Sequence, residues 1–116
     1  SVYNAIDIAL DPFPFGGGTV SYEALWMGVP VLTLAGDVLM GRLSGSLMHR
    51  LGLPDWVTHS SADYITTAER LATDKVSLAT LRKGLRAKAQ DTIFDAQAHV
   101  LELEAVFENA WRDQVD

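Results

Sequence analysis

The chain contains no cysteine, which excludes disulfides and metal sites built from thiolates. Its apolar runs are far too short to cross a bilayer, and its first residues carry no basic segment followed by an apolar one. We therefore expect no membrane partner and no signal peptide. Together with the absence of cysteine, this pattern predicts a cytoplasmic location.

Positive charge is scarce and unevenly placed. Nine Lys and Arg residues stand against fifteen Asp and Glu, for a formal net charge of −6, and all nine cations lie at Arg42 or later. A nucleic-acid partner needs a basic stripe, so we expect none. An anion bound before Arg42 must be held by backbone N–H groups and a helix N-terminus, or by a cation from elsewhere. His49, His59 and His99 lack the spacing of metal ligands, so we expect no metal site.

Alternating strands and helices are predicted in the first part of the chain, residues 1–60. Short apolar segments predict strands at Ala5–Leu10, Val29–Leu34 and Trp56–Thr58. Between them, helices are predicted from Thr19 to Trp26, with Gly28 as its end, and from Met40 to Leu51, with Gly52 as its end. Strands that are apolar throughout need cover on both faces, so this order predicts an α/β fold with a partial Rossmann-like, three-layer parallel sheet.

Helices are predicted for the second part, residues 61–116. Ser60, Asp74 and Asp95 are suited to cap three successive helices, and Ser60 is followed by Asp63 as in a capping box. The last helix carries one apolar stripe: Ala96, Val100, Leu103, Phe107 and Trp111. With 116 residues, of which 48% are hydrophobic, the chain is one globular domain or part of one, ending in a helical tail. We expect Trp26, Trp56 and Trp111 to pack in the core or between helices.

Three consecutive glycines, Gly16, Gly17 and Gly18, separate the first predicted strand from its helix. In open α/β sheets ligands bind at this place, beyond the carboxyl ends of the strands. Glycines there can take positive φ and let a ligand approach the backbone, while the free N–H groups of the next helix bind phosphate. Thr19 could add a hydroxyl donor. These features indicate a phosphate site at the helix tip.

Glu23 lies four residues after Thr19 and therefore on the same helical face. A carboxylate there could accept two hydrogen bonds from the vicinal hydroxyls of a nucleotide ribose. The residues are equally compatible with an ordinary tight turn and a glutamate that only interacts with the helix dipole. The P-loop is excluded because no Lys-Ser/Thr pair follows the glycines, and Gly16-x-Gly18-x-x-Ser21 is only a partial dinucleotide fingerprint.

Two blocks, "IDIALDPFPFGGGTVSYEALWMGVPVLTLAGD" and "RLSGSLMHRLGLPDWV", closely resemble the C-terminal catalytic region of the O-linked N-acetylglucosamine transferase/SPINDLY family. The resemblance runs from Ile6 to about Trp111. It implies two Rossmann-like lobes in the glycosyltransferase B architecture, of which this chain is the C-terminal half of the nucleotide-binding lobe. It also implies an inverting, metal-independent transfer of a sugar to Ser or Thr of proteins, in members that often follow tetratricopeptide repeats.

The resemblance assigns roles to particular residues. The loop from Gly16 to Thr19, continued by Val20, would cradle the donor diphosphate, and Glu23 would bind the ribose. Relatives commonly carry two threonines where this chain has Thr19 and Val20, so one hydroxyl donor is missing. Arg42 could reach a phosphate or the sugar. The expected donor is UDP-GlcNAc, with GDP-fucose or UDP-glucose as alternatives; no cofactor is required, and no general base can be assigned.

The family's phosphate-binding lysine and N-terminal lobe lie upstream of the matching region. We therefore expect the 116 residues to be a fragment of a larger transferase, without turnover alone. The alternative is a non-catalytic structural or interaction module with a vestigial nucleotide site. In either case, uncovered sheet edges and apolar faces predict self-association, edge to edge or through the last helix.

Overall fold

Three parallel strands in the order β1-β2-β3 form the sheet of the computed structural model, which describes residues 2–115. The strands are β1 (Ala9–Leu10), β2 (Val31–Leu34) and β3 (Val57–Thr58). Ala9 lies opposite Val31, and Thr33 lies opposite Val57. The predicted parallel α/β sheet is confirmed, but the strands are shorter than predicted. Val2–Ala5 is a 3-10 helix, η1, because β1 finds partners only at the start of β2.

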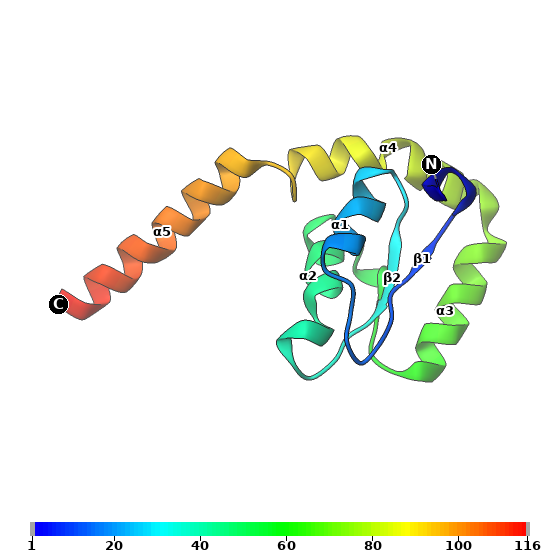
Figure 1. Ribbon diagram of the computed structural model, residues 1–116, viewed down its shortest axis with the longest axis horizontal. Helices are drawn as coiled ribbons and strands as arrows, with labels where there is room; N and C mark the ends of the chain where they lie inside the picture. Colours follow the sequence, from blue (N-terminus) through cyan, green and yellow to red (C-terminus); the bar gives the residue numbers. More distant parts are fainter. Residues whose placement is uncertain (1, 116) are drawn as a thin grey trace.

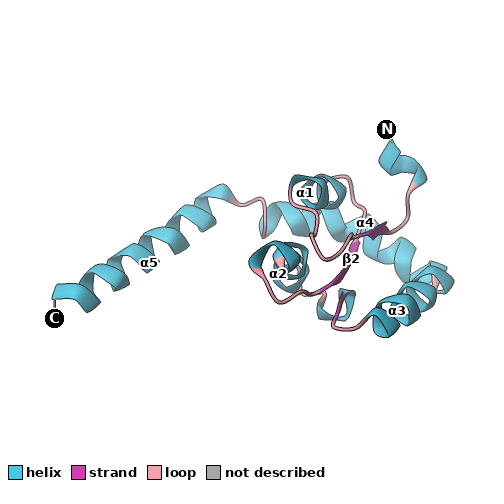
Figure 2. Cartoon of the chain, turned by 60° about the horizontal axis from the view of Figure 1, so that its bottom comes forward, coloured by secondary structure: helices cyan, strands magenta, loops and turns pink. Residues whose placement is uncertain are grey.

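Helices cover both faces of this sheet. They are α1 (Thr19–Trp26), α2 (Leu43–Arg50), α3 (Ser61–Thr73), α4 (Lys75–Asp91) and α5 (Ala96–Val115), with short 3-10 turns η2 (Leu39–Gly41) and η3 (Pro54–Trp56). Figures 1 and 2 show α1 and α2 on one side of the strands and α3 on the other, while α4 crosses one end of the sheet. This is the predicted three-layer arrangement.

The helix boundaries follow local chemistry. Gly28 and Gly52 adopt positive φ, +76° and +72°, and end α1 and α2 as predicted. The Ser60 hydroxyl accepts a hydrogen bond from the Asp63 N–H at 3.1 Å, and Asp74 Oδ1 accepts one from the Ser77 N–H at 3.2 Å. Asp95 Oδ1 likewise accepts the Ala98 N–H at 2.9 Å. All three predicted caps are therefore confirmed, and each satisfies a backbone donor that would otherwise have no partner.

The helix predicted from Met40 to Leu51 is broken into η2 and α2. Gly41 is folded against the preceding loop, where its carbonyl accepts the Gly36 N–H at 2.9 Å. A Cβ on Gly41 would lie 2.9 Å from the Pro14 carbonyl oxygen. This close approach of two loops overrides the helical spacing at Met40, and α2 begins only after it.

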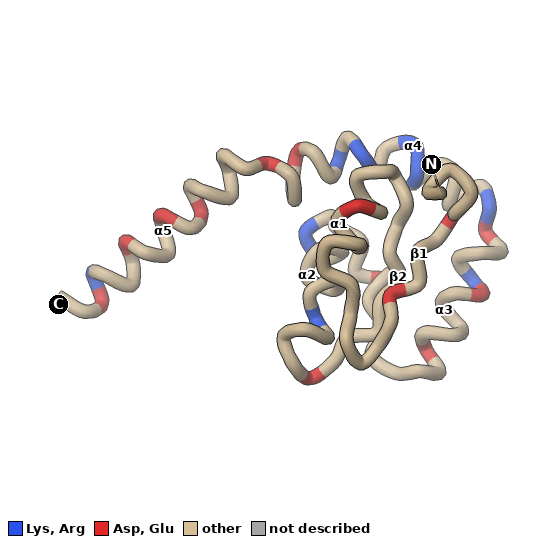
Figure 3. The backbone as a smooth tube through the Cα atoms, in the orientation of Figure 1, with Lys and Arg blue, Asp and Glu red and all other residues tan. Residues whose placement is uncertain are grey.

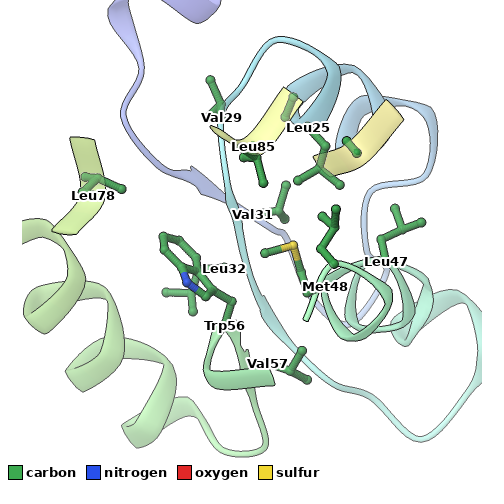
Figure 4. Close-up of a cluster of buried hydrophobic side chains, with 13 residues drawn as sticks. Leu25, Val29, Val31, Leu32, Leu47, Met48, Trp56, Val57, Leu78 and Leu85 are labelled. Carbon is green, nitrogen blue, oxygen red and sulfur yellow. The ribbon is translucent and has the colours of Figure 1, made fainter. Parts of the chain in front are cut away.

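One hydrophobic core lies between the sheet and its helices (Figure 4). Leu25 of α1, Leu32 of β2 and Met48 of α2 are completely buried in it, and Leu85 of α4 closes one end. Trp56 is 5% exposed, which confirms its predicted place in the core. The layers are thus held together by one continuous set of buried apolar contacts.

The last helix, α5, extends away from this core (Figure 1). A compact domain of this length has a radius of gyration of about 13 Å, whereas the Cα atoms here give 16.1 Å. Trp111 is 68% exposed, so the prediction that it packs inside is wrong within the described residues. The Arg50–Glu102 ion pair, at 3.0 Å, links α5 to α2. In residues 2–115 we find no helix with the length and apolarity that a membrane span requires.

Candidate functional site

The glycine loop lies between β1 and α1, at the carboxyl end of the sheet. Gly18 is the N-cap of α1, and no side chain caps this helix. Ser21 and Tyr22 donate their N–H groups to the Gly18 carbonyl, at 3.0 and 3.3 Å. Within residues 2–115, the N–H groups of Gly18, Thr19 and Val20 have no acceptor. The tip of α1 therefore offers three backbone donors and the positive end of the helix dipole.

The other two glycines point their N–H groups into the protein. Gly16 donates to the Met40 carbonyl at 3.1 Å, and Gly17 donates to Asp11 Oδ1 at 2.7 Å. In this structure neither N–H is free to donate to a ligand. Among the described residues, only Gly28 and Gly52 have positive φ. The three adjacent glycines of the loop therefore do not adopt the positive φ that glycine permits.

Gly17 is required for close packing. A Cβ on it would lie 2.6 Å from Ser21 Oγ, a distance that real Cβ atoms do not tolerate. A Cβ on Gly18 would meet nothing within 4 Å. Gly17 therefore faces the interior, and Gly18 faces open space.

The side chain of Asp11 is hydrogen-bonded to the glycine loop. This residue follows β1 directly and is only 5% exposed. Its Oδ2 accepts the Thr33 hydroxyl at 2.7 Å, in addition to the Gly17 N–H on Oδ1, and its carbonyl accepts the Tyr64 hydroxyl at 2.9 Å. Burial raises the pKa of Tyr64, and the nearby charge of Asp11 adds to the rise. The phenol therefore remains a hydrogen-bond donor at neutral pH.

Two buried serine hydroxyls form a second set of hydrogen bonds at the loop. Ser44 of α2 donates to the Gly17 carbonyl at 3.1 Å. The Ser21 and Ser44 hydroxyls lie 2.8 Å apart, and because Ser44 has only one hydroxyl hydrogen, Ser21 is the donor between them. This chain of hydrogen bonds joins α1, α2 and the glycine loop.

Glu23 and Thr19 line one groove, as their spacing predicts. The groove has a volume of about 400 Å³ and is lined by Tyr3, Thr19, Tyr22, Glu23, Trp26, Met27 and Phe94. Its walls are mostly apolar, and Phe94 packs edge-on against Tyr22 and Trp26, with ring centroids 5.8 and 5.1 Å away. The groove thus joins an apolar surface to a single carboxylate, next to the free N–H groups.

Glu23 already has a partner in this groove. The Tyr3 hydroxyl donates to Glu23 Oε2 at 3.3 Å. Desolvation raises the pKa of Tyr3, and the Glu23 carboxylate raises it further. The phenol is therefore neutral at physiological pH, and its hydrogen bond to Glu23 is long enough to be exchanged for a stronger one.

Comparison with known proteins gives this site a family. The model of glycosyl transferase family 41 matches residues 4–103. The chain belongs to glycosyl transferase family 41. It is 37% identical over 115 residues to a rice (Oryza sativa subsp. japonica) protein described as a probable UDP-N-acetylglucosamine–peptide N-acetylglucosaminyltransferase SPINDLY, covering 98% of this chain and 12% of that protein.

A second relative and a solved structure are also similar to this chain. A Caenorhabditis elegans UDP-N-acetylglucosamine–peptide N-acetylglucosaminyltransferase is 31% identical over 107 residues, covering 91% of this chain and 9% of that protein. The solved structure of a Thermobaculum terrenum O-GlcNAc transferase mutant superposes with a TM-score of 0.86 at 42% identity, covering 97% of this chain and 22% of that one. The sequence resemblance and the fold class are thus confirmed, while this chain spans about an eighth of the length of its plant relatives.

Arg42, the remaining residue predicted for the family 41 donor site, lies at the same edge of the sheet. Its loop contacts the glycine loop through the bond from the Gly16 N–H to the Met40 carbonyl. The side chain is exposed, and in the described chain it forms no ion pair, with Asp37 or any other residue. Figure 3 shows that the β1–α1 loop itself carries no Lys or Arg. Arg42 is therefore near the site without contacting it.

A larger cavity, of about 750 Å³, lies at the opposite end of the strands. It is lined in part by Asp7 and Gly28, which precede β1 and β2. Its central cation, Arg82, already binds Asp7 Oδ1 at 2.5 Å and the Gly28 carbonyl at 3.2 Å. Ligands of such sheets bind at the carboxyl ends of the strands, and this cavity lies at the other end.

Sequence reasoning missed the residues that support the loop: Asp11, Ser21, Thr33, Ser44 and Tyr64. One signal was available, since Asp11 and Thr33 are polar residues within or directly after apolar strands. Such residues are buried only when their polar atoms have partners. The Asp11 and Thr33 side chains bond to each other, and the remaining contacts come from α2 and α3, which no local pattern connects to the loop.

Proposed function

We propose that these 116 residues form the donor-binding part of a protein O-glycosyltransferase of family 41. The full-length enzyme would transfer a sugar from a nucleotide donor to Ser or Thr of proteins. The printed names of the relatives favour UDP-GlcNAc as donor, with GDP-fucose and UDP-glucose as the alternatives to test. The observation that carries the proposal is that the free N–H groups at the tip of α1 adjoin the groove lined by Thr19 and Glu23, since Thr19 belongs to both.

In this proposal, the N–H groups of Gly18, Thr19 and Val20 hold the diphosphate at the tip of α1. Such preorganised donors stabilise the negative charge that develops on the departing nucleoside diphosphate. The Thr19 hydroxyl adds one donor. Gly16 and Gly17 give the loop its shape and donate to no ligand. Arg42 supplies positive charge from the neighbouring loop.

Glu23 would accept hydrogen bonds from the ribose hydroxyls. To do so it exchanges its single long bond with Tyr3, of 3.3 Å, for two shorter bonds to the ribose hydroxyls. Glu23 orients the nucleotide and takes no proton from the acceptor. Binding energy from base and ribose is then used to position the anomeric carbon for attack. No step is assigned to a metal ion, and no residue of this chain is assigned as the general base.

The binding test uses the 116-residue chain, titrated with UDP and GDP by calorimetry or NMR. We expect saturable binding that Glu23→Ala weakens about 10- to 100-fold, the range for losing charge-assisted hydrogen bonds. Glu104→Ala on α5 is the matched control, because it removes the same charge from an exposed helix outside the groove. Equal affinities for the chain with Glu23→Ala and the chain with Glu104→Ala would contradict the assignment of Glu23.

We also propose that the chain has no turnover alone, because it is a piece of the donor-binding lobe that lacks an acceptor surface. A donor-hydrolysis assay on the 116 residues tests this point. The expected result is no activity above buffer. Clear, saturable hydrolysis of UDP-GlcNAc would contradict it.

The second candidate is a structural or interaction module with a vestigial site. It is favoured by α5, whose apolar stripe is exposed along its whole length. On this hypothesis the chain self-associates through α5 or the sheet edge and binds no nucleotide, even at millimolar concentration. Self-association together with UDP binding would support the first proposal with an added interface.

A further inference from the structure

The buried carboxyl group of Asp11 has no cationic partner among residues 2–115. The three ion pairs formed by residues 2–115 do not include it. Its carboxylate accepts two hydrogen bonds of 2.7 Å, from the Gly17 N–H and the Thr33 hydroxyl. A charge in this position is stabilised only by such short, charge-assisted bonds. Its side chain is therefore tightly tied to the backbone of the glycine loop.

The glycine loop packs closely against the Asp11 carboxylate. A Cβ on Gly16 would lie 3.0 Å from Asp11 Oδ2, and a Cβ on Gly17 would lie 3.1 Å from Oδ1. The hydrogen bond to Asp11 thus keeps the Gly17 N–H directed toward the protein interior. The Gly17 carbonyl is held inward as well, by the Ser44 hydroxyl at 3.1 Å.

The direction of the Gly18 N–H follows from these two contacts. In a trans peptide group the C=O and N–H bonds point in opposite directions, and the peptide that joins Gly17 to Gly18 is trans. Because Ser44 and the interior hold the Gly17 carbonyl, the Gly18 N–H must point outward. Fixing Gly17 at both its N–H and its carbonyl therefore sets the direction of the first free donor of the site.

We propose that Asp11 is a positioning residue for the donor site, acting through the Gly17 N–H to keep the N–H groups of Gly18, Thr19 and Val20 aimed at a bound diphosphate. This inference rests on the proposed function. Three adjacent glycines form the most flexible backbone available, and a ligand that had to order them would bind more weakly. Because Asp11 already orders the loop in the free protein, the ligand does not have to supply the free energy of ordering it.

The sign of the effect separates positioning from simple electrostatics. Asp11 is negative and lies beneath an anion site, so its charge alone disfavours a diphosphate. Removing the charge would strengthen binding if electrostatics dominated. Positioning predicts the opposite, namely that loss of Asp11 or of its orientation weakens binding.

The main test is the pair Thr33→Val and Thr58→Val in the 116-residue chain. Each removes a buried strand hydroxyl, but only Thr33 contacts Asp11, whereas Thr58 donates to the Thr33 carbonyl at 2.9 Å. We expect Thr33→Val to weaken UDP binding at least fivefold and to shift the Gly17 amide proton resonance. Thr58→Val should change the affinity less than twofold, although both variants lower Tm. Equal affinities in the two variants would overturn the inference.

A second pair examines Asp11 itself. Asp11→Asn keeps an acceptor for the Gly17 N–H and loses the charge, while Asp11→Ala loses both. We expect UDP affinity to fall in the order wild type, Asp11→Asn, Asp11→Ala. Tighter binding by Asp11→Asn than by the wild type would overturn the positioning role.

Hydrogen exchange of the loop amides tests the positioning role of Asp11 independently of the proposed function. In the wild-type chain without ligand, the Gly17 amide should exchange at least tenfold more slowly than the Gly18 amide, and Asp11→Ala should abolish the difference. Wild-type chain that binds no UDP would remove the proposed function without altering this result. Equal exchange rates at Gly17 and Gly18 would overturn the inference even if UDP binds.

Discussion

The glycine loop and helix α5 use polar and apolar groups in opposite ways. In the loop, several inward-facing polar groups meet partners from β2, α2 and α3, and the N–H groups at the tip of α1 have no acceptor in residues 2–115. In α5, apolar side chains such as Phe107 and Trp111 are exposed, and a surface ion pair to Arg50 links the helix to the rest. The loop is thus organised by the chain itself, whereas α5 is an amphipathic element whose apolar stripe has no cover in the described residues.

The largest expected effect is on the free energy of unfolding, which should respond strongly to a change in the core beneath the loop and weakly to a change in α5. Leu25→Ala empties a completely buried position and should cost about 2–5 kcal/mol. Leu103→Ala in α5, where the side chain is 44% exposed, should change the free energy of unfolding by less than about 0.5 kcal/mol. Urea denaturation measures both. A large cost at Leu103 would mean that α5 packs on something in solution, such as a second copy.

The next effect lies within the loop. Gly17→Ala places a Cβ 2.6 Å from Ser21 Oγ and should destabilise by about 1–3 kcal/mol, as overpacking does. Gly18→Ala meets open space and should alter stability by less than about 1 kcal/mol. UDP titration of the same variants sharpens the comparison, because the Gly18 methyl group is added on the ligand-facing side. Equal stabilities would contradict the packing role of Gly17.

A smaller effect concerns association through α5. Phe107→Glu adds a charge to the apolar stripe and should shift the chain toward monomer in sedimentation at high concentration. Asn109→Glu adds the same charge at a position outside the stripe and is the control. A wild-type chain that is already monomeric at high concentration would contradict self-association.

The smallest effect is expected at the start of α4. The hydrogen bond from Ser77 lowers the pKa of Asp74 below its usual value of 3.8. Its stabilising contribution is therefore fully present above about pH 4 and is lost as the pH falls through the lower, folded-state pKa. Asp74→Ala should lower Tm slightly at pH 7 and should remove this acid dependence. An unchanged Tm would mean that the cap contributes nothing measurable.

Much of the fold could be predicted because its signals are local. The bounds of α1, its end at Gly28 and the caps at Ser60 and Asp74 depend on residues within one or two helical turns. The length of β1 could not be predicted, because an apolar segment pairs only as far as its neighbour extends. Trp111 was misplaced because helical periodicity indicates which face is apolar and says nothing about what covers it.

The sequence by itself determined where the glycine loop lies, that Thr19 and Glu23 share a helical face, and that the strands are parallel, since spacing and residue type carry that information. Only the tertiary structure decided which glycine donates inward and which donors remain free. That division depends on Asp11, Thr33 and Ser44, and Thr33 and Ser44 lie 22 and 33 positions beyond Asp11 in the numbering. Hydrogen bonds between such distant residues form only when the layers pack, because packing is what removes water from these groups and makes each unpaired donor costly.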